Sequence, residues 1–211
     1  MANTINACIV GWGNVGKAVL EALRASGDFR LCGLIRRSVP DQLPPELSGV
    51  EVASEVSRLS QRPDVAILCT PSRSVPEVAP LYLSQGINTV DSYDIHTTIY
   101  EVRQKLEQAA KAGNAAAILS AGWDPGSDSV VRALMQSCAP EGITYTNFGP
   151  GMSMGHTVAV KAVEGVRAAL SMTIPLGTGI HRRMVYVELE PGADYQEVAG
   201  RIKADPYFVH D

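Results

Sequence analysis

Short apolar runs alternate with helical patterns through the first 138 residues. The apolar runs predict buried strands over residues 6–11, 30–35, 64–69, 87–90 and 116–119. Between them, apolar residues recur at spacings of three and four, which predicts helices over residues 14–26, 75–85, 97–112 and 125–138. Strands that alternate with helices indicate an α/β fold, with a doubly wound parallel sheet covered on both faces.

The pattern changes after Pro140 and predicts a second, α+β domain. Alternating residues indicate strands over residues 143–148, 166–174 and 184–189. A loop rich in Gly and Met is expected over residues 149–156, and a helix over residues 194–203. We expect the boundary near residues 120–123, which gives domains of residues 1–121 and 122–211.

Composition narrows the class of protein. At roughly 150 residues per domain, 211 residues make one large domain or two small ones. The net charge of −4 makes nucleic acid or an anionic membrane a poor partner. No apolar run is long enough to span a membrane and no signal peptide is recognisable, so we expect a cytoplasmic protein. The four scattered cysteines are expected to be buried free thiols, and no metal site is predicted.

Residues 11–16, GWGNVG, fit the pattern G-x-G-x-x-G between a predicted strand and a predicted helix. In a dinucleotide-binding site Gly11 permits the tight turn, Gly13 lets the backbone approach a pyrophosphate, and Gly16 lets helix and strand pack closely. The helix N-terminus offers unpaired N–H groups to the phosphates. A glycine-rich turn without a ligand is the alternative.

Two arginines follow the second predicted strand. An NAD-selective site usually has an acidic residue here for the ribose 2′-hydroxyl, but this chain has Arg36 and Arg37. Two guanidinium groups favour a 2′-phosphate, which predicts NADP over NAD. A solvated basic turn is the alternative.

Polar loops follow three further strands. Thr70, Pro71, Ser72 and Arg73 end the strand at 64–69, where a loop either flanks a cofactor or forms an ordinary turn. Carboxylates follow the next two strands in DSYD, residues 91–94, and WDPG, residues 123–126. Both carboxylate segments fall on the same edge as the phosphate loop, where two acids can bind a substrate ammonium.

The acids also have a structural interpretation. Asp124 and Pro125 fit the N-cap and first position of the following helix, and Asp94 could cap the helix after it. In the second domain, N–H groups of the loop at 149–156 could receive a carboxylate, or the loop could be an ordinary turn. The basic triplet at 181–183 precedes a predicted strand and either clamps a carboxylate or forms a charged strand end.

Seven segments, in this order along nearly the whole chain, resemble meso-diaminopimelate dehydrogenases: GWGNVG, IRRS, CTPSRSVPE, TVDSYDIH, SAGWDPG, TNFGPGMSMGH and ELEPGAD. The resemblance implies a Rossmann-type domain, a substrate and dimerisation domain, and a cytoplasmic homodimer. It implies NADP-dependent oxidative deamination of the D-centre of meso-2,6-diaminopimelate. A hydride passes to the nicotinamide, the imine is hydrolysed with release of ammonia, and L-2-amino-6-oxopimelate cyclises to tetrahydrodipicolinate. The reverse reaction, a reductive amination, links the family to lysine and cell-wall precursor synthesis.

The resemblance also implies roles for individual residues. The cofactor would contact Gly11, Trp12, Gly13, Asn14, Val15, Arg36, Arg37, Thr70, Pro71, Ser72, Arg73, Ser92 and Tyr93. Asp94 and Asp124 would contact the reacting amino group as catalytic residues. The rest of the substrate would contact Trp123, Phe148, Met154, Thr173 and Arg183, with Arg183 as the carboxylate partner.

One departure concerns the C-terminal end. Family members continue beyond residue 211 and normally supply a His and an Asn to the substrate site, so the second domain is expected to be incomplete. Tyr207, Phe208 and Val209 are apolar and no predicted element follows to cover them. Two alternatives stay open: an NADP-binding protein without catalysis, and a reductase of a cyclic imine of the dihydrodipicolinate type. The two acids favour an ammonium-bearing substrate over the cyclic imine.

Overall fold

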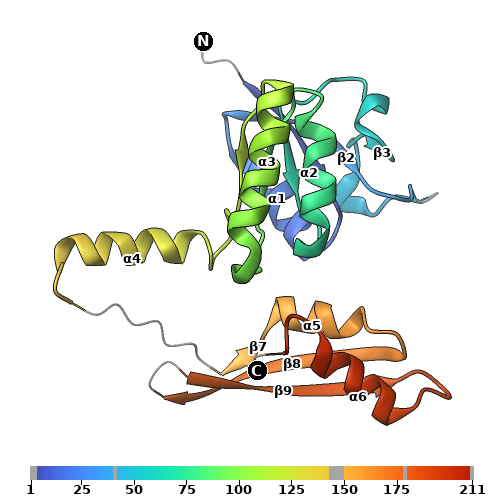
Figure 1. Ribbon diagram of the computed structural model, residues 1–211. Helices are drawn as coiled ribbons and strands as arrows, with labels where there is room; N and C mark the ends of the chain where they lie inside the picture. The colour runs from blue at the N-terminus through green and yellow to red at the C-terminus, as the bar shows by residue number, and fades with distance from the viewer. Residues whose placement is uncertain (1–3, 40–41, 143–149, 178–179, 210–211) are drawn as a thin grey trace. The chain divides into compact units, whose positions relative to one another are not determined.

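The computed structural model describes residues 4–39, 42–142, 150–177 and 180–209 (Figure 1). The chain divides into two compact units, residues 1–134 and 135–211, which are described separately. Helix α4 (Ser127–Cys138) crosses from the first unit into the second.

The first unit contains a six-stranded parallel sheet in the order β3-β2-β1-β4-β5-β6. Its strands are β1 (Ile5–Val10), β2 (Phe29–Ile35), β3 (Val52–Ala53), β4 (Val65–Leu68), β5 (Asn88–Asp91) and β6 (Ala117–Ile118). This is the strand order of dinucleotide-binding folds, and it confirms the predicted doubly wound sheet. The edge strand β3 was not predicted, whereas β6, which is also two residues long, lies within the predicted strand at 116–119.

Helices cover both faces of this sheet. On one face α1 (Asn14–Ala25) contributes Leu20 and Leu23 to a core that includes residues of β1, β2 and β4. On the other face α2 (Val75–Leu83) and α3 (Ile99–Gly113) pack side by side (Figure 1). Short 3₁₀ helices complete the connections: η1 (Pro45–Leu47), η2 (Val56–Arg58), η3 (Ser72–Ser74) and η4 (His96–Thr98).

The second unit is a three-stranded antiparallel sheet with two helices. Its elements are β7 (Gly151–Met152), α5 (Met154–Lys161), β8 (Val166–Gly177), β9 (Ile180–Leu189) and α6 (Tyr195–Ala204). The expected loop over residues 149–156 is wrong, because β7 and the first turn of α5 lie there. Ser153 precedes this helix, and its hydroxyl hydrogen-bonds His156 Nδ1 at 2.9 Å. The strand expected over residues 143–148 lies outside the described residues.

The segment after α6 folds back into the core of the second unit. Phe208 is only 8% exposed and belongs to a cluster with Val160 and Val198. Its ring and that of Tyr207 meet the His156 imidazole edge-on, at centroid distances of 5.2 and 5.3 Å. The expectation that these apolar residues are left uncovered is therefore wrong for Phe208, although Val209 is exposed.

The cysteines match the prediction in part. All four are free thiols; Cys8 and Cys32 are buried, Cys69 is half-buried and Cys138 is exposed. Burial raises the pKa of Cys8 to about 12 and that of Cys69 to about 11, which keeps both thiols protonated at neutral pH. The described residues include no His, Cys, Asp or Glu group suited to a metal ion.

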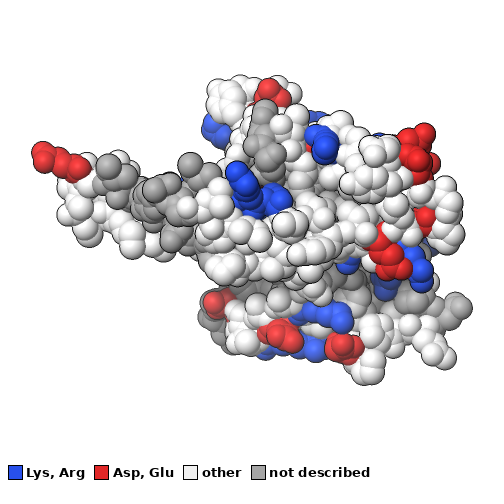
Figure 2. Space-filling model, turned by 90° about the horizontal axis from the view of Figure 1, so that it is seen from below, with Lys and Arg blue, Asp and Glu red and all other residues white. Residues whose placement is uncertain are grey.

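Within the described part of the chain, none of the helices combines the length and apolar character needed to cross a lipid bilayer. On the face shown in Figure 2, basic and acidic side chains of the described residues are interspersed among neutral ones.

Candidate functional site

The loop after β1 has the geometry of a dinucleotide turn. Gly11 has φ +99°, and a Cβ there would lie 2.6 Å from the Cys69 carbonyl oxygen. A Cβ at Gly16 would lie 2.5 Å from the Gly11 carbonyl oxygen, so helix α1 approaches the turn too closely for a side chain. Both positions therefore require glycine, as the sequence pattern predicts.

The N-terminus of α1 has room for an anionic ligand. Gly13 is the N-cap, no side chain caps the helix, and nothing lies within 4 Å of where a Cβ on Gly13 would be. The N–H groups of the first turn have no partner within the helix, and the helix dipole favours a negative charge there. Trp12 packs partly against the core, while Asn14 and Val15 are exposed at this end. The loop thus fits a pyrophosphate.

Arg36 and Arg37 follow β2 on the same edge of the sheet. The backbone N–H of Arg36 donates to the Ala53 carbonyl at 3.0 Å, which holds the backbone of Arg36 beside β3. Arg36 is half-buried and Arg37 is exposed, and neither guanidinium makes an ion pair with any other described residue. Two available guanidinium groups fit a 2′-phosphate.

The loops after β4 and β5 are joined by Ser72 and Asp94. The Ser72 hydroxyl donates to Asp94 Oδ1 at 2.6 Å and accepts from the Asp94 backbone N–H at 3.2 Å. Asp94 does not cap a helix, because α3 begins at Ile99 with Thr98 as its N-cap. The capping alternative for Asp94 is therefore wrong. The hydrogen bonds connect Ser72, which was predicted to contact the cofactor, with Asp94, which was predicted to contact the substrate.

Asp91 connects the two loops that contain the predicted acids. Its Oδ1 accepts from the backbone N–H groups of Tyr93 at 2.9 Å and Ser120 at 3.1 Å, and its carbonyl accepts from Ala121 at 2.7 Å. The residue is 3% exposed, and burial raises the pKa of its carboxyl while the two backbone hydrogen bonds oppose the rise. No separate role was predicted for Asp91, although its position at the end of a predicted strand could have indicated one.

Tyr93 was predicted to contact the cofactor, and its side chain lies in the core. Its hydroxyl is 2.6 Å from Thr98 Oγ1, and the residue is only 3% exposed. Three buried oxygens at the ends of neighbouring strands have no hydrogen-bond partner among the described residues: Thr70 Oγ1, Asp91 Oδ2 and Ser120 Oγ. Polar atoms of a bound ligand or water would satisfy them.

Asp124 lies in a tight loop ahead of α4. Gly126 has φ +144°, and a Cβ there would overlap the Gly122 carbonyl, so the loop requires glycine at this position. The loop is closed by backbone hydrogen bonds from Ser127 to Gly122 at 3.1 Å and from Asp128 to Trp123 at 2.9 Å. Helix α4 begins at Ser127, so the interpretation of Asp124 as N-cap and Pro125 as first helical residue is wrong.

The Asp124 side chain is bound to Arg132, for which no role was predicted from the sequence. Arg132 Nη2 lies 3.0 Å from Asp124 Oδ1 and 2.9 Å from Asp128 Oδ2. Arg132 and Asp128 are four residues apart on α4, a spacing typical of helical ion pairs that could have been recognised. Trp123, beside Asp124, is 59% exposed.

In the second unit, two predicted substrate residues contact each other. Thr173 on β8 pairs in register with Arg183 on β9, and Arg183 Nη1 donates to Thr173 Oγ1 at 2.5 Å. Residues 181–183 lie within β9, so the expectation that they precede the strand is wrong. Met154 is the first residue of α5 and is half exposed, and Phe148 lies outside the described residues.

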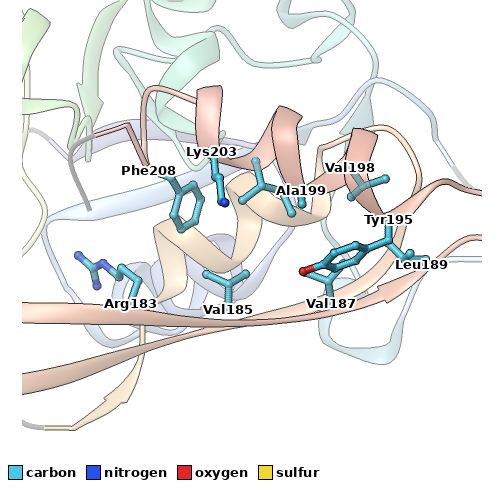
Figure 3. Close-up of a pocket in the computed structure, with 10 residues that line it drawn as sticks. Arg183, Val185, Val187, Leu189, Tyr195, Val198, Ala199, Lys203 and Phe208 are labelled. Carbon is cyan, nitrogen blue, oxygen red and sulfur yellow. The ribbon is translucent and has the colours of Figure 1, made fainter.

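Arg183 also lies at one end of a pocket of about 320 Å³ between β9 and α6 (Figure 3). Tyr195 and Leu189 lie at the other end. Alternate residues of β9 face this pocket, and the apolar lining includes Val185, Val187, Val198, Ile202 and Phe208. Thr173 and Arg183, which are cross-strand partners, therefore lie on the face of the sheet that α6 covers.

Comparison with known proteins identifies the relatives of this chain. Residues 5–119 match the model of an oxidoreductase family with an NAD-binding Rossmann fold, and residues 122–182 match the diaminopimelic acid dehydrogenase C-terminal domain. A meso-diaminopimelate D-dehydrogenase of Bacteroides fragilis is 59% identical over 98% of this chain and 69% of its own length. The chain belongs to the meso-diaminopimelate dehydrogenase family.

Solved structures agree with this membership. The diaminopimelate dehydrogenase of Corynebacterium glutamicum in complex with diaminopimelate superposes with a TM-score of 0.79 at 32% identity, over 98% of this chain and 68% of that one. An engineered D-amino acid dehydrogenase bound to NADP⁺ gives a TM-score of 0.82 at 28% identity, with the same coverage. The chain thus spans about two thirds of the length of these relatives.

Proposed function

We propose that this chain catalyses the NADP-dependent oxidative deamination of the D-centre of meso-2,6-diaminopimelate, with reductive amination as the reverse reaction. The observation that carries the proposal is the arrangement at the carboxyl edge of the parallel sheet. Four segments follow strands of this sheet and support the proposal: the glycine turn at Gly11, the pair Arg36 and Arg37, and the loops with Asp94 and Asp124.

NADP is the cofactor that these residues fit. The turn at Gly11 and the uncapped N-terminus of α1 would hold the pyrophosphate, and Arg36 and Arg37 the 2′-phosphate. The loop of Thr70, Pro71, Ser72 and Arg73 and the backbone of Ser92 and Tyr93 would flank the remainder. When bound, the oxidised nicotinamide supplies the hydride acceptor.

Asp94 and Asp124 would bind the reacting amino group. Both lie at the ends of neighbouring strands, and both have a partner for one carboxylate oxygen, Oδ1. A carboxylate with a fixed orientation binds an ammonium ion in a defined position, which places the D-carbon for hydride loss. Trp123 would close the side of this pocket.

Arg183 would bind a substrate carboxylate. Its bond to Thr173 uses one guanidinium N–H and orients the planar group. A guanidinium can bind a carboxylate through two parallel hydrogen bonds, which suits a substrate with two carboxylates and two ammonium groups. Met154 and Phe148 would contribute apolar contacts to the aliphatic chain.

We also propose that the chain forms homodimers through the second unit. Cross-strand partners align Met152, Met172 and Met184 on the face of the sheet away from α6, next to Tyr186, which is 59% exposed. An apolar sheet face of this kind is typical of a contact surface.

We place the protein in the cytoplasm, a proposal that its free cysteines support. The boundary between the dinucleotide-binding domain and the substrate domain would lie between residues 121 and 122.

The proposal is tested by replacing the two acids. Asp94→Ala and Asp124→Ala should each lower kcat for meso-diaminopimelate at least about 100-fold, since each removes a group that positions the reacting amine. Binding of NADP⁺, measured by calorimetry, should stay within about twofold of the parent chain. Full turnover in either variant would refute the role of that acid. Equal loss of NADP⁺ binding would mean that the residue supports the fold instead.

A further inference from the structure

Arg132 has no place in the function proposed above, yet it contacts one of the two predicted catalytic acids. One guanidinium nitrogen of Arg132, Nη2, makes both contacts: it lies 3.0 Å from Asp124 Oδ1 and 2.9 Å from Asp128 Oδ2. The bond to Asp124 has hydrogen-bonding geometry, whereas the contact with Asp128 is an ion pair without it. The acid side chains are 17% and 15% exposed, and that of Arg132 is 40% exposed.

The loop and the side chain of Asp124 are held by different means. Backbone hydrogen bonds close the loop at Gly122 and Trp123, and they do not involve the carboxylate. Among the described residues, the Asp124 carboxylate makes its ion pair and hydrogen bond with Arg132 alone, through Oδ1. Arg132 is therefore the described side chain that can fix the orientation of this carboxylate.

The formal charges of Asp124, Asp128 and Arg132 also fit the binding of an ammonium group. Asp124, Asp128 and Arg132 together have one net negative charge. The guanidinium offsets the mutual repulsion of two poorly exposed carboxylates, and the remaining charge can attract an ammonium group. Asp128, one helical turn before Arg132, holds the guanidinium from its own helix.

We propose that Arg132 is a positioning residue, which holds Asp124 Oδ1 so that Oδ2 is directed at the reacting amino group of the substrate. This inference rests on the proposed function, because it assigns Asp124 to that amino group. A carboxylate free to rotate would bind the ammonium in several orientations, and small errors in orientation are costly for hydride transfer. Arg132 would therefore act on turnover more than on cofactor binding.

The test compares Arg132→Met and Arg132→Lys in the full chain, with Arg103→Met as the matched control. Arg103 is an exposed arginine on α3 that pairs only weakly with Glu107, at 4.0 Å. We expect R132M to lower kcat about 10- to 100-fold with NADP⁺ binding unchanged, and R132K to recover part of the loss. R103M should behave as the parent chain. In an Asp124→Asn background, R132M should cost less than about twofold further, because the group it positions is gone.

A second measurement does not need turnover. The carboxyl ¹³C resonance of Asp124, assigned through D124N, should move in R132M and stay in place in R103M. If the parent chain does not turn over meso-diaminopimelate, the proposed function fails, and this resonance alone decides whether Arg132 holds Asp124. An unmoved resonance overturns the inference, and so does an R132M variant that loses kcat equally in the parent background and in the D124N background.

Discussion

The buried carboxylate of Asp91 offers the sharpest test of how the site is built. Asp91→Ala and Asp91→Asn both remove the charge, but only the Ala variant removes the acceptor that Tyr93 and Ser120 share. Asn keeps the Oδ1 acceptor and nearly the same shape. The difference in stability between these two variants therefore measures the two hydrogen bonds that join the acid-bearing loops.

The expected difference follows from the burial of the donors. A buried N–H left without a partner costs about 1–3 kcal/mol, so two such groups would cost about 2–6 kcal/mol. Tyr93 is buried, but Ser120 is half-buried and water can replace part of its bond. We therefore expect D91A to be about 2–4 kcal/mol less stable than D91N.

The pH dependence of folding stability gives a second, independent test of the burial of Asp91. Burial raises the pKa of Asp91 in the folded state, so the folded protein binds this proton more tightly than the unfolded chain does. Stability from this group is fully present below the unfolded pKa of about 3.9 and is lost as pH rises through the folded pKa. D91N lacks this dependence, so its stability relative to the parent chain should be highest near neutral pH and should fall as the pH is lowered.

Urea unfolding followed by tryptophan fluorescence measures these differences. The two tryptophans, Trp12 and Trp123, both lie in the first unit, so the signal reports the unit that contains Asp91. Stabilities of D91A and D91N equal within about 0.5 kcal/mol would refute the bridging role of Asp91. A parent chain that loses stability relative to D91N on acidification would refute the burial argument.

Three further predictions address the cofactor, the acid loop and the assembly. Arg36→Asp removes a charge-assisted contact of about 1.5–3 kcal/mol, so the Kd of NADP⁺ should rise roughly 10- to 150-fold while the Kd of NAD⁺ stays unchanged. Arg58→Asp is the control, and equal effects on the binding of both cofactors would contradict the 2′-phosphate assignment. Gly126→Ala places a methyl group against the Gly122 carbonyl, so kcat should fall at least about 10-fold with NADP⁺ binding retained, and parental kcat would count against the loop geometry. Tyr186→Lys should convert a dimer into a monomer of 22.5 kDa in light scattering, whereas Tyr100→Lys should not; a parent chain that is itself monomeric would end the dimer proposal.

The first unit could be predicted from sequence because its strands are buried on both faces. Continuous apolar runs and Gly or Pro boundaries located β1, β2, β4 and β5 within two residues. The second unit was harder to predict. The glycines and methionines of residues 149–156 suggested a loop, but Ser153 at the N-cap and the burial of Thr157, Ala159 and Val160 favour a helix from Met154 onward.

The site could be predicted as a set of positions but not as a set of contacts. The rule that ligands bind at the carboxyl ends of parallel strands located the loops of Asp94 and Asp124 correctly on one edge. The side-chain partners, Ser72 for Asp94 and Arg132 for Asp124, depend on how loops from different strands approach each other. Sequence spacing along one strand or helix contains no information about such contacts, apart from the four-residue spacing of Asp128 and Arg132.

The proposed oxidation of the D-centre of meso-diaminopimelate with NADP⁺ can be tested on the chain itself. The most direct measurement is NADPH formation by the purified chain with meso-diaminopimelate, beside the LL isomer, which has no D-centre. We expect NADPH from the meso isomer with one ammonium ion released for each NADPH, and none from the LL isomer. Equal rates with both isomers, or NADP⁺ binding without any turnover of the meso isomer, would contradict the proposed function.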